Sequence, residues 1–194
     1  MQVIKKSSGG IQSLPLDAML LSKRMVFLSG IITSDSADAI LRQMVYLTEE
    51  DPSAPVKLII NSPGGSVSAG LAIYDQIKGS PVPVEVYCTE LAASMAAHLL
   101  AAGAPGKRFI LRHSRVIIHE PLISSESGGI SGSATDIQKT AESIMKTKRQ
   151  LVELLAQDTG HTIEEIEAAT SFDNIMDAEQ AVAFGLCDRI VDHI

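Results

Sequence analysis

The chain has 194 residues, of which 45% are hydrophobic and 20% are charged, and its formal net charge is −7. This length suits one well-packed domain, and this composition excludes an intrinsically disordered chain. The acidic balance and the lack of a Lys/Arg cluster argue against a nucleic-acid-binding protein.

The cysteines and the apolar runs indicate where the protein works. Cys88 and Cys187 lie in apolar surroundings and form no Cys-x-x-Cys pair. The sequence therefore predicts neither a disulfide framework nor a metal site, and it fits a reducing compartment. No apolar signal-peptide core follows the first residues, and the longest apolar stretch, 99–104, is far too short to span a membrane. We expect a soluble, cytoplasmic protein without a cofactor.

Strand-like and helix-like segments alternate over the first two thirds of the chain. Runs of apolar, often β-branched residues predict strands, and apolar residues at helical spacing or helix-stop signals predict helices. In chain order the predicted elements are a strand at 25–28, a helix at 35–50, a strand at 57–60, a helix at 67–78, a strand at 84–88, a helix at 94–102, and strands at 109–111 and 116–118. This order predicts an α/β fold with a mainly parallel sheet and helical crossovers.

The pattern changes after Pro121. Residues 124–133 are rich in Ser and Gly and predict a loop or a weak extended segment, and residues 136–158 predict an amphipathic helix. A helix of about 20 residues is about 30 Å long, which is longer than a core of this size needs. We expect it to project and pack on a partner, with burial inside its own domain as the alternative. Capping boxes at Thr162 and Asp177 predict two short helices, and 190–191 predicts a last strand.

The turn Pro63-Gly64-Gly65 leads directly from a predicted strand into a predicted helix. Glycine permits backbone conformations that other residues rarely adopt, and a helix N-terminus presents unpaired N–H groups. The turn therefore favours an anion or oxyanion site. It is not a phosphate-binding loop, because the Lys-Ser/Thr ending is missing. The alternative is a turn with a purely structural use.

Ser94 lies at a second strand-to-helix junction. A serine at this place is first of all a candidate N-cap. The segment lacks the Gly-x-Ser-x-Gly pattern of a nucleophile elbow, but Ala92 and Ala96 are small enough for a similarly tight turn. As a nucleophile, Ser94 would still need a base.

His119 is the preferred base, because it ends a predicted strand and parallel sheets build their sites at the carboxyl ends of strands. The alternative is a histidine without a catalytic role. His98 is a rival base one helical turn after Ser94, but two side chains on one stiff helix have little freedom to align. Spacing alone does not choose the orienting carboxylate among Asp158, Asp173, Asp177 and Asp188.

Taken together, these motifs resemble those of the Clp protease proteolytic subunit family (caseinolytic peptidase P) over nearly the whole chain, from about residue 7 to 191. The matching segments are Phe27-Leu28-x-Gly30, Ile60-Asn61-Ser62-Pro63-Gly64-Gly65, Ala92-Ala93-Ser94-Met95, Gly106-Lys107-Arg108-Phe109, His119-x-Pro121-Leu122, and Asp173-Asn174 with 178–186. Each motif is weak by itself, whereas all of them in this order are highly specific.

The resemblance implies a crotonase-like spiral of βαβ units and a serine endopeptidase. It implies a catalytic triad of Ser94, His119 and Asp173. It implies oxyanion-hole amides from Gly65 and Met95 and no metal. The substrate-binding backbone that it implies lies at Gly64, Ser66, Val67, Leu122 and Ile123.

The resemblance also implies an assembly. Family members form two stacked heptameric rings around a chamber, in which they degrade unfolded proteins and peptides delivered by an ATP-driven AAA+ Clp unfoldase. In a single peptidase domain spanning 1–194, residues of about 1–20 would form an N-terminal pore segment and about 123–158 the handle strand and helix. The rings would contain this chain alone or this chain with a second proteolytic-subunit paralogue.

Several features depart from the family pattern. Extra residues occur at 123–127, Ser171-Phe172 replace a common Asp-Arg pair, and Glu90 and Glu120 add carboxylates near His119. We therefore expect ring stacking and activation to differ from the common pattern, and the two carboxylates could raise the pKa of His119.

Two other functions compete with the active peptidase. An inactive chamber subunit is disfavoured by the intact Ser94, His119 and Asp173. An acyl-CoA enzyme of the crotonase type would use the Gly64 and Gly65 amides for a thioester oxyanion. It would need neither Ser94 nor His119, and no basic patch for the CoA phosphates is evident.

Overall fold

The computed structural model describes residues 1–7, 10–122 and 131–194. Its central sheet contains five parallel strands in the order β3 (Met25–Ser29), β4 (Val56–Ser62), β5 (Val84–Ala93), β6 (Arg108–Leu111) and β9 (Arg189–Val191). In addition to β6, β5 pairs in parallel with β7 (Arg115–Ile118). The short strand β8 (Asn174–Met176) pairs antiparallel with β7. The predicted α/β fold with a mainly parallel sheet is confirmed.

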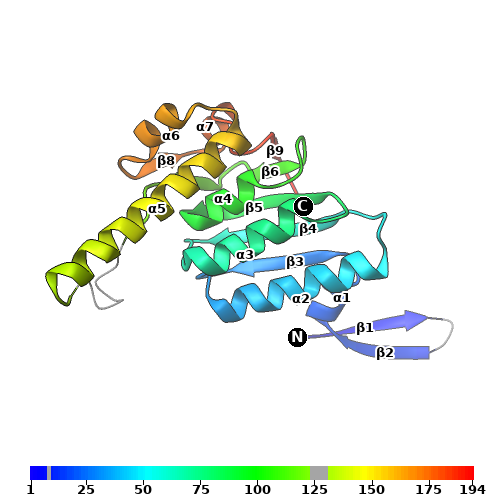
Figure 1. The fold of residues 1–194 in the computed structure, drawn as a ribbon. Coiled ribbons are helices and arrows are strands. Elements are labelled where there is room, and N and C mark those ends of the chain that lie inside the picture. The colour runs from blue at the N-terminus through cyan, green and yellow to red at the C-terminus, as the bar shows by residue number, and fades with distance from the viewer. Residues whose placement is uncertain (8–9, 123–130) are drawn as a thin grey trace.

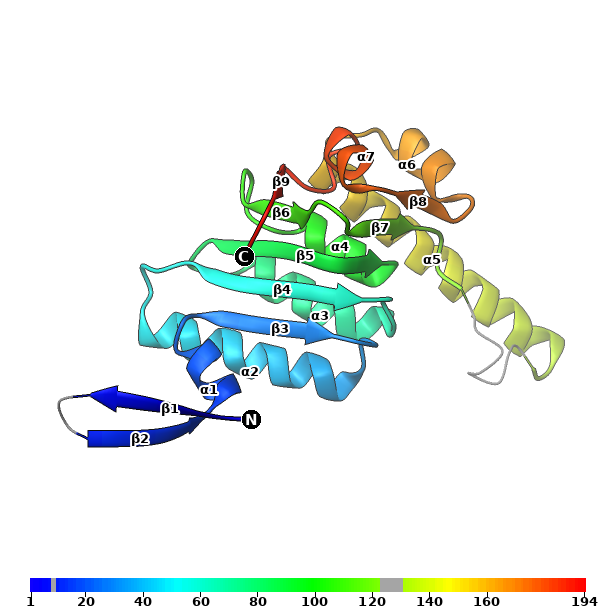
Figure 2. The same cartoon turned by 180° about the vertical axis from the view of Figure 1, so that it is seen from behind.

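One face of the sheet is covered by α2 (Ser34–Glu50), α3 (Val67–Lys78) and α4 (Met95–Ala101), as Figure 1 shows, and the other face of β3, β4 and β5 turns toward the viewer in Figure 2. The core lies between the sheet and these helices, where Leu58, Ile60, Ile73 and Leu99 are fully buried. At Gly70 of α3, an added Cβ would lie only 2.1 Å from Cγ of Met95. Small residues therefore let α3 and α4 approach closely at the start of α4.

The C-terminal part adds α5 (Ala134–Thr159), α6 (Ile163–Thr170) and α7 (Ala178–Ala183). Only Leu151, Val152 and Leu155 of α5 are buried, and its first half extends beyond the sheet in Figures 1 and 2. That α5 packs on a partner stays a prediction. The capping boxes at Thr162 and Asp177 are confirmed. In the described ranges, no helix is long and apolar enough to cross a membrane.

Some elements differ from the sequence-based expectation. The chain begins with an antiparallel hairpin of β1 (Gln2–Ser7) and β2 (Gly10–Pro15), followed by α1 (Leu16–Leu21), and these elements and β8 were not predicted. The strand predicted at 84–88 was too short. After a shift in register, β5 continues to Ala93, because Ala92 pairs with Ser62 of β4 and Leu91–Ala93 pair with β7. The strand therefore runs directly into Ser94.

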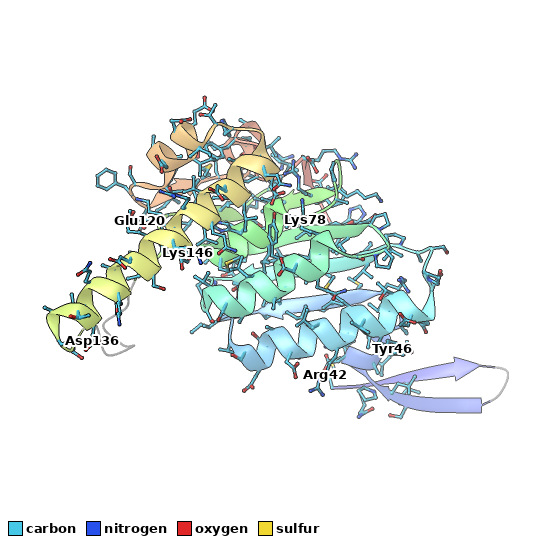
Figure 3. The ribbon with its side chains drawn as sticks, in the orientation of Figure 1. Arg42, Tyr46, Lys78, Glu120, Asp136 and Lys146 are labelled. Atoms are coloured by element: carbon cyan, nitrogen blue, oxygen red, sulfur yellow. The ribbon has the colours of Figure 1, made fainter. Side chains whose placement is uncertain are left out.

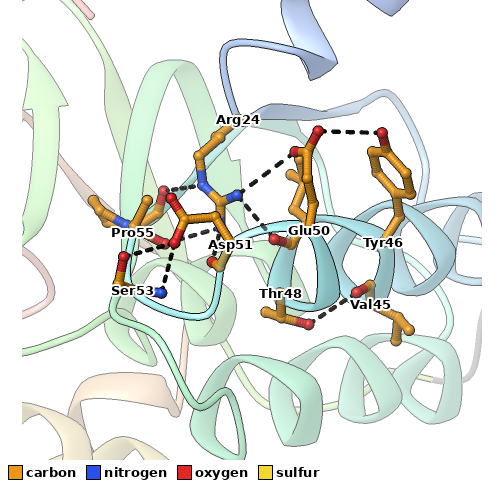
Figure 4. Close-up of polar contacts among 10 residues, drawn as sticks. Arg24, Val45, Tyr46, Thr48, Glu50, Asp51, Ser53 and Pro55 are labelled. Atoms are coloured by element: carbon orange, nitrogen blue, oxygen red, sulfur yellow. Dashed lines mark hydrogen bonds and ion pairs between the residues drawn. The ribbon is translucent and has the colours of Figure 1, made fainter.

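A single arginine organises the end of α2. Arg24 has a φ of 61°, and its guanidinium donates hydrogen bonds to the carbonyls of Leu47, Asp51, Ala54 and Pro55 (Figure 4). A cation is favourable at a helix C-terminus, where the last carbonyls lack partners within the helix. Arg24 therefore holds the turn between α2 and β4, the strand that carries the glycine turn described next.

Candidate active site

Ser94 forms the turn between β5 and α4 by itself. Its backbone has φ 54° and ψ −125°, a combination that residues other than glycine rarely adopt. Its N–H donates to the carbonyl of Ile117 in β7 at 2.8 Å. The hydroxyl makes no capping hydrogen bond, so the N-cap interpretation of this side chain is wrong. A tight turn at the end of a strand instead presents an uncommitted serine hydroxyl, as a nucleophile elbow does.

The Gly64-Gly65 turn packs directly against this elbow. Gly64 has a φ of +92°, and an added Cβ would lie 2.8 Å from Cβ of Ser94 and 3.1 Å from N of Met95. Gly65 has a φ of +149°, and an added Cβ would lie 2.3 Å from O of Ile32. Both positions therefore require glycine, and the two strand-to-helix junctions that the sequence singles out are in contact.

Two backbone N–H groups remain free beside Ser94. Ile32 donates to the carbonyl of Gly64 at 2.8 Å and accepts from the N–H of Ser66 at 2.9 Å. In a parallel bridge of this kind the N–H of Gly65, between them, points away from Ile32. Within the described residues, neither Gly65 N–H nor Met95 N–H donates a hydrogen bond. Such a pair of amides, one of them at a helix N-terminus, can stabilise an oxyanion.

We expect Gly64→Ala to lower kcat for peptide hydrolysis about 10²–10³-fold, the effect of losing one oxyanion donor. The reason is steric, because the methyl group would press on Ser94 and on the amide of Met95. Turnover of a fluorogenic peptide by the assembled protein measures it. Gly106→Ala is the matched control, because Gly106 also has a positive φ, +77°, but an added Cβ there meets nothing within 4 Å. A Gly64→Ala protein within threefold of wild type would contradict the expectation.

His119 follows β7 at the same edge of the sheet. Ala93 of β5 pairs with Ile117 of β7, so Ser94 and His119 both lie just beyond the carboxyl ends of neighbouring parallel strands. The next amide, Glu120 N–H, donates to the carbonyl of Thr170 at 2.9 Å and directs the chain away. The side chain is half-buried, and its Nδ1 is buried without a hydrogen-bond partner among the described residues.

His98, the rival base, is only 3% exposed. Its Nδ1 lies 3.2 Å from the backbone carbonyl of Ser94, not from the hydroxyl, and its Nε2 is buried without a partner in the described part of the chain. Burial lowers the pKa of His98, more than the nearby carbonyls of Ser94 and Leu151 raise it. This arrangement argues against His98 as the base for Ser94.

Three of the four candidate carboxylates have other partners. Asp158 accepts hydrogen bonds from Tyr74 Oη at 2.9 Å and Lys78 Nζ at 2.8 Å. Asp177 caps α7, and Asp188 pairs with Arg108. These three carboxylates therefore have evident structural roles.

Asp173 is the fourth candidate, and it precedes β8. Ile118 of β7 pairs with Asn174 of β8, so extending the antiparallel register by one pair brings Asp173 opposite His119. Asp173 is exposed, and its carboxylate makes no hydrogen bond to His119 in this arrangement. The topology thus places the two residues at the ends of adjacent, paired strands.

The two added carboxylates have partners of their own. Glu90 accepts from Asn61 Nδ2 at 2.6 Å. Glu120 forms an ion pair with Lys148 of α5, and Figure 3 shows Glu120 beside that helix. Lys148 thereby ties the segment after His119 to α5, a contact that the sequence analysis missed. The sequence carries a signal for it, because Lys148 interrupts the regularly spaced apolar residues of this helix, which include Ile144, Leu151 and Leu155.

The other predicted site residues are spread over two segments. Gly64, Ser66 and Val67 lie together at the start of α3, where the Ser66 side chain caps the helix by accepting from Ala69 N–H. Leu122 is 72% exposed in the segment after His119. Ile123 and the extra residues at 123–127 lie outside the described residues. Phe172, beside Asp173, is 84% exposed.

Comparison with known protein families gives one result for the whole chain. The family model described as Clp protease matches residues 8–194, which include the central sheet, both strand-to-helix junctions and α5. The mixed α/β architecture with its mainly parallel sheet agrees with the crotonase-like fold of that family. Members generally form oligomeric rings that work with AAA+ unfoldases. The chain therefore belongs to the Clp protease family of serine-type peptidase subunits.

Proposed function

We propose that this chain is the proteolytic subunit of an ATP-dependent Clp protease and a serine endopeptidase that uses a triad of Ser94, His119 and Asp173. The observation that carries the proposal is the contact between the two junctions. An uncommitted serine hydroxyl on a strained turn meets a glycine turn with a free amide, and His119 lies at the same sheet edge.

The chemistry follows from these positions. Oγ of Ser94 attacks the peptide carbonyl while Nε2 of His119 takes the hydroxyl proton and then gives it to the leaving amine. The N–H groups of Gly65 and Met95 stabilise the oxyanion of the tetrahedral intermediate. A water molecule, activated by His119, then hydrolyses the acyl-enzyme. The carboxylate of Asp173 would hold His119 with its proton on Nδ1 and stabilise the imidazolium.

Asp173 directly precedes β8 and His119 directly follows β7, so the two residues lie at the ends of paired strands. The proposed triad requires the exposed Asp173 side chain to move toward Nδ1 of His119. Catalytic hydrogen bonds are often formed only in the substrate complex. The present separation is therefore compatible with the proposed roles.

The backbone at Gly64, Ser66 and Val67, together with Leu122 and Ile123, would bind an extended substrate by strand-like pairing. The N–H of Gly65 would contact the scissile carbonyl of a substrate bound in this way. Main-chain pairing depends little on side chains. The proposed enzyme would accept unfolded proteins and peptides with weak sequence selectivity.

The proposed assembly is two stacked heptameric rings around a chamber, built from this chain alone or with a paralogue, and supplied by an AAA+ Clp unfoldase in the cytoplasm. The support is α5, whose projecting half exposes Ile137 at 43% and Met145 at 62%. Apolar side chains on a projecting helix favour a contact with a second copy. The β1–β2 hairpin would form the pore segment. Phe172 would replace an electrostatic contact between rings, so we propose that stacking differs from the common pattern.

A fluorophosphonate probe tests the proposed nucleophile. We expect the assembled protein, with its unfoldase supplied where needed, to form an adduct that mass spectrometry locates at Ser94, and we expect no adduct in Ser94→Ala. Sedimentation of the same samples measures the assembly. An assembled wild-type protein that the probe does not label at Ser94 would contradict the proposal.

A further inference from the structure

The segment that follows His119 is held from two sides. Strand pairing of β7 ends at Ile118, one residue before the histidine. Beyond the strand, the N–H of Glu120 donates to the carbonyl of Thr170, the last residue of α6, at 2.9 Å. The carboxylate of Glu120 forms an ion pair with Nζ of Lys148 in α5. His119 therefore lies between the end of a strand and a point that two helices hold.

The backbone of Glu120 has little freedom of its own. Pro121 follows it, and a residue before proline is largely confined to extended conformations. The freedom that remains is movement of the segment as a whole against its surroundings. The N–H of Glu120 restrains this movement on the side of α6, and the ion pair with Lys148 restrains it on the side of α5.

Lys148 is a firm anchor because of its place on α5. The buried residues of this helix are Leu151, Val152 and Leu155, all on the C-terminal side of Lys148. Residues three and four positions apart lie on the same face of a helix, so Lys148 shares a face with Leu151 and Val152. These side chains and His119 line the space between α5 and the segment after β7. Lys148 thus lies where the projecting part of α5 meets its packed part.

The ion pair matters more for geometry than for stability. The side chains of Lys148 and Glu120 are 27% and 41% exposed, and ion pairs with this exposure add little to the free energy of folding. Catalysis depends far more steeply on position, because displacing a catalytic group by about 1 Å can lower the rate about 100-fold. A contact that contributes little to stability can therefore have a large effect where it fixes a base.

We propose that Glu120 and Lys148 are a positioning pair for His119: their ion pair ties the segment after β7 to α5 and thereby holds the imidazole where it can take the proton of Ser94. Neither side chain of the pair takes part in the chemistry. The inference rests on the proposed function. It also gives the packed half of α5 a role at the site, because this half carries the anchor of the base.

The kinetics of peptide hydrolysis by the assembled protein test the pair. Glu120→Met and Lys148→Met each replace one partner by an uncharged side chain of similar length, and we expect kcat to fall about 10-fold. KM should stay within about twofold of the wild type, because the glycine turn and the start of α3 are unchanged. Tm should change by less than about 3 °C, because the pair is partly exposed.

Lys146→Met is the matched control. Lys146 lies two residues before Lys148 on α5 (Figure 3), is exposed and forms no ion pair with another described residue. Its substitution removes the same charge from the same helix, but it leaves the contact with Glu120 in place. This variant should keep the wild-type kcat.

Two restoring variants distinguish a positioning pair from two side chains that are needed separately. Glu120→Gln keeps an oxygen that accepts a hydrogen bond from Lys148, so its kcat should stay within about threefold of the wild type. The exchange E120K/K148E reverses the pair. It should also return kcat to within about threefold of the wild type, although each of its single substitutions lowers kcat.

Glu120→Met and Lys148→Met proteins that assemble and keep kcat within twofold of the wild type would overturn the inference. An exchange variant that is no more active than its single parents would overturn it as well. In both cases, labelling of the wild type at Ser94 leaves the proposed function intact. Absence of that labelling would instead refute the proposed function.

A zero-length carbodiimide cross-link gives a second readout that needs no variant. The reagent joins a carboxylate directly to an amine that is in contact with it. We expect mass spectrometry of the assembled wild type to find Glu120 joined to Lys148, and absence of this cross-link would overturn the inference.

Discussion

Ser94→Ala is expected to lower kcat for peptide hydrolysis about 10⁶-fold, because the proposed nucleophile is removed. The hydroxyl lies on a turn where it caps nothing, so its loss should leave the fold unchanged. Hydrolysis of a fluorogenic peptide by the assembled protein measures the effect. More than one per cent of wild-type turnover in the purified variant would contradict the assignment of Ser94 as nucleophile.

Ser94→Gly is the control that separates chemistry from backbone strain. Both variants lack Oγ, but glycine adopts φ 54° and ψ −125° readily, whereas alanine does not. We therefore expect equal loss of activity and a Gly variant that is more stable than the Ala variant by about 1 kcal/mol. In a domain of this size this difference corresponds to about 2–4 °C in Tm. Thermal unfolding of the two variants side by side measures it.

Asp173→Asn is expected to lower kcat about 10⁴-fold, because an amide would donate to Nδ1 of His119 and favour the wrong tautomer. Asp173 is exposed and unpaired among the described residues, so the free energy of unfolding should change by less than about 0.5 kcal/mol. Peptide turnover and thermal unfolding of the same preparation measure the two quantities.

Asp177→Asn is the matched control for this substitution. Asp177 lies one β-strand further along the same segment and caps α7, a place where asparagine serves as well as aspartate. This variant should keep wild-type turnover. If Asp173→Asn keeps more than a tenth of wild-type kcat, Asp173 is not the orienting group.

Local signals in the sequence predicted many of the elements. The helix expected at 67–78 begins after Ser66, which caps it, and ends at Gly79, so α3 has the expected bounds. The capping boxes at Thr162 and Asp177 involve residues only three positions apart, and both helices form as predicted. These signals are readable because donor and acceptor lie within one helical turn of each other.

Elements that depend on distant pairing were missed or shortened. β8 has only three residues and forms because β7, more than 50 positions earlier, provides its partner. The end of β5 contains Thr89 and Glu90, which break the apolar run, yet the pairing of Leu91–Ala93 with β7 keeps the strand extended. Propensity in such short polar segments is weak, and tertiary context decides their conformation.

The same division holds for the site. By itself the sequence determined that Ser94 and the Gly64-Gly65 turn each join a strand to a helix, and that His119 ends a strand, because hydrophobic periodicity locates strand ends. Spacing left four carboxylates open, since spacing along a chain carries no information on which strands pair, and only the family resemblance implied Asp173. The tertiary structure adds that Asp158 is engaged with Tyr74 and Lys78, some 80 residues away, and that β8 lies beside β7. The tertiary structure also decided the strained backbone conformation of Ser94 and the burial of His98, because strain and burial are properties of the packed chain.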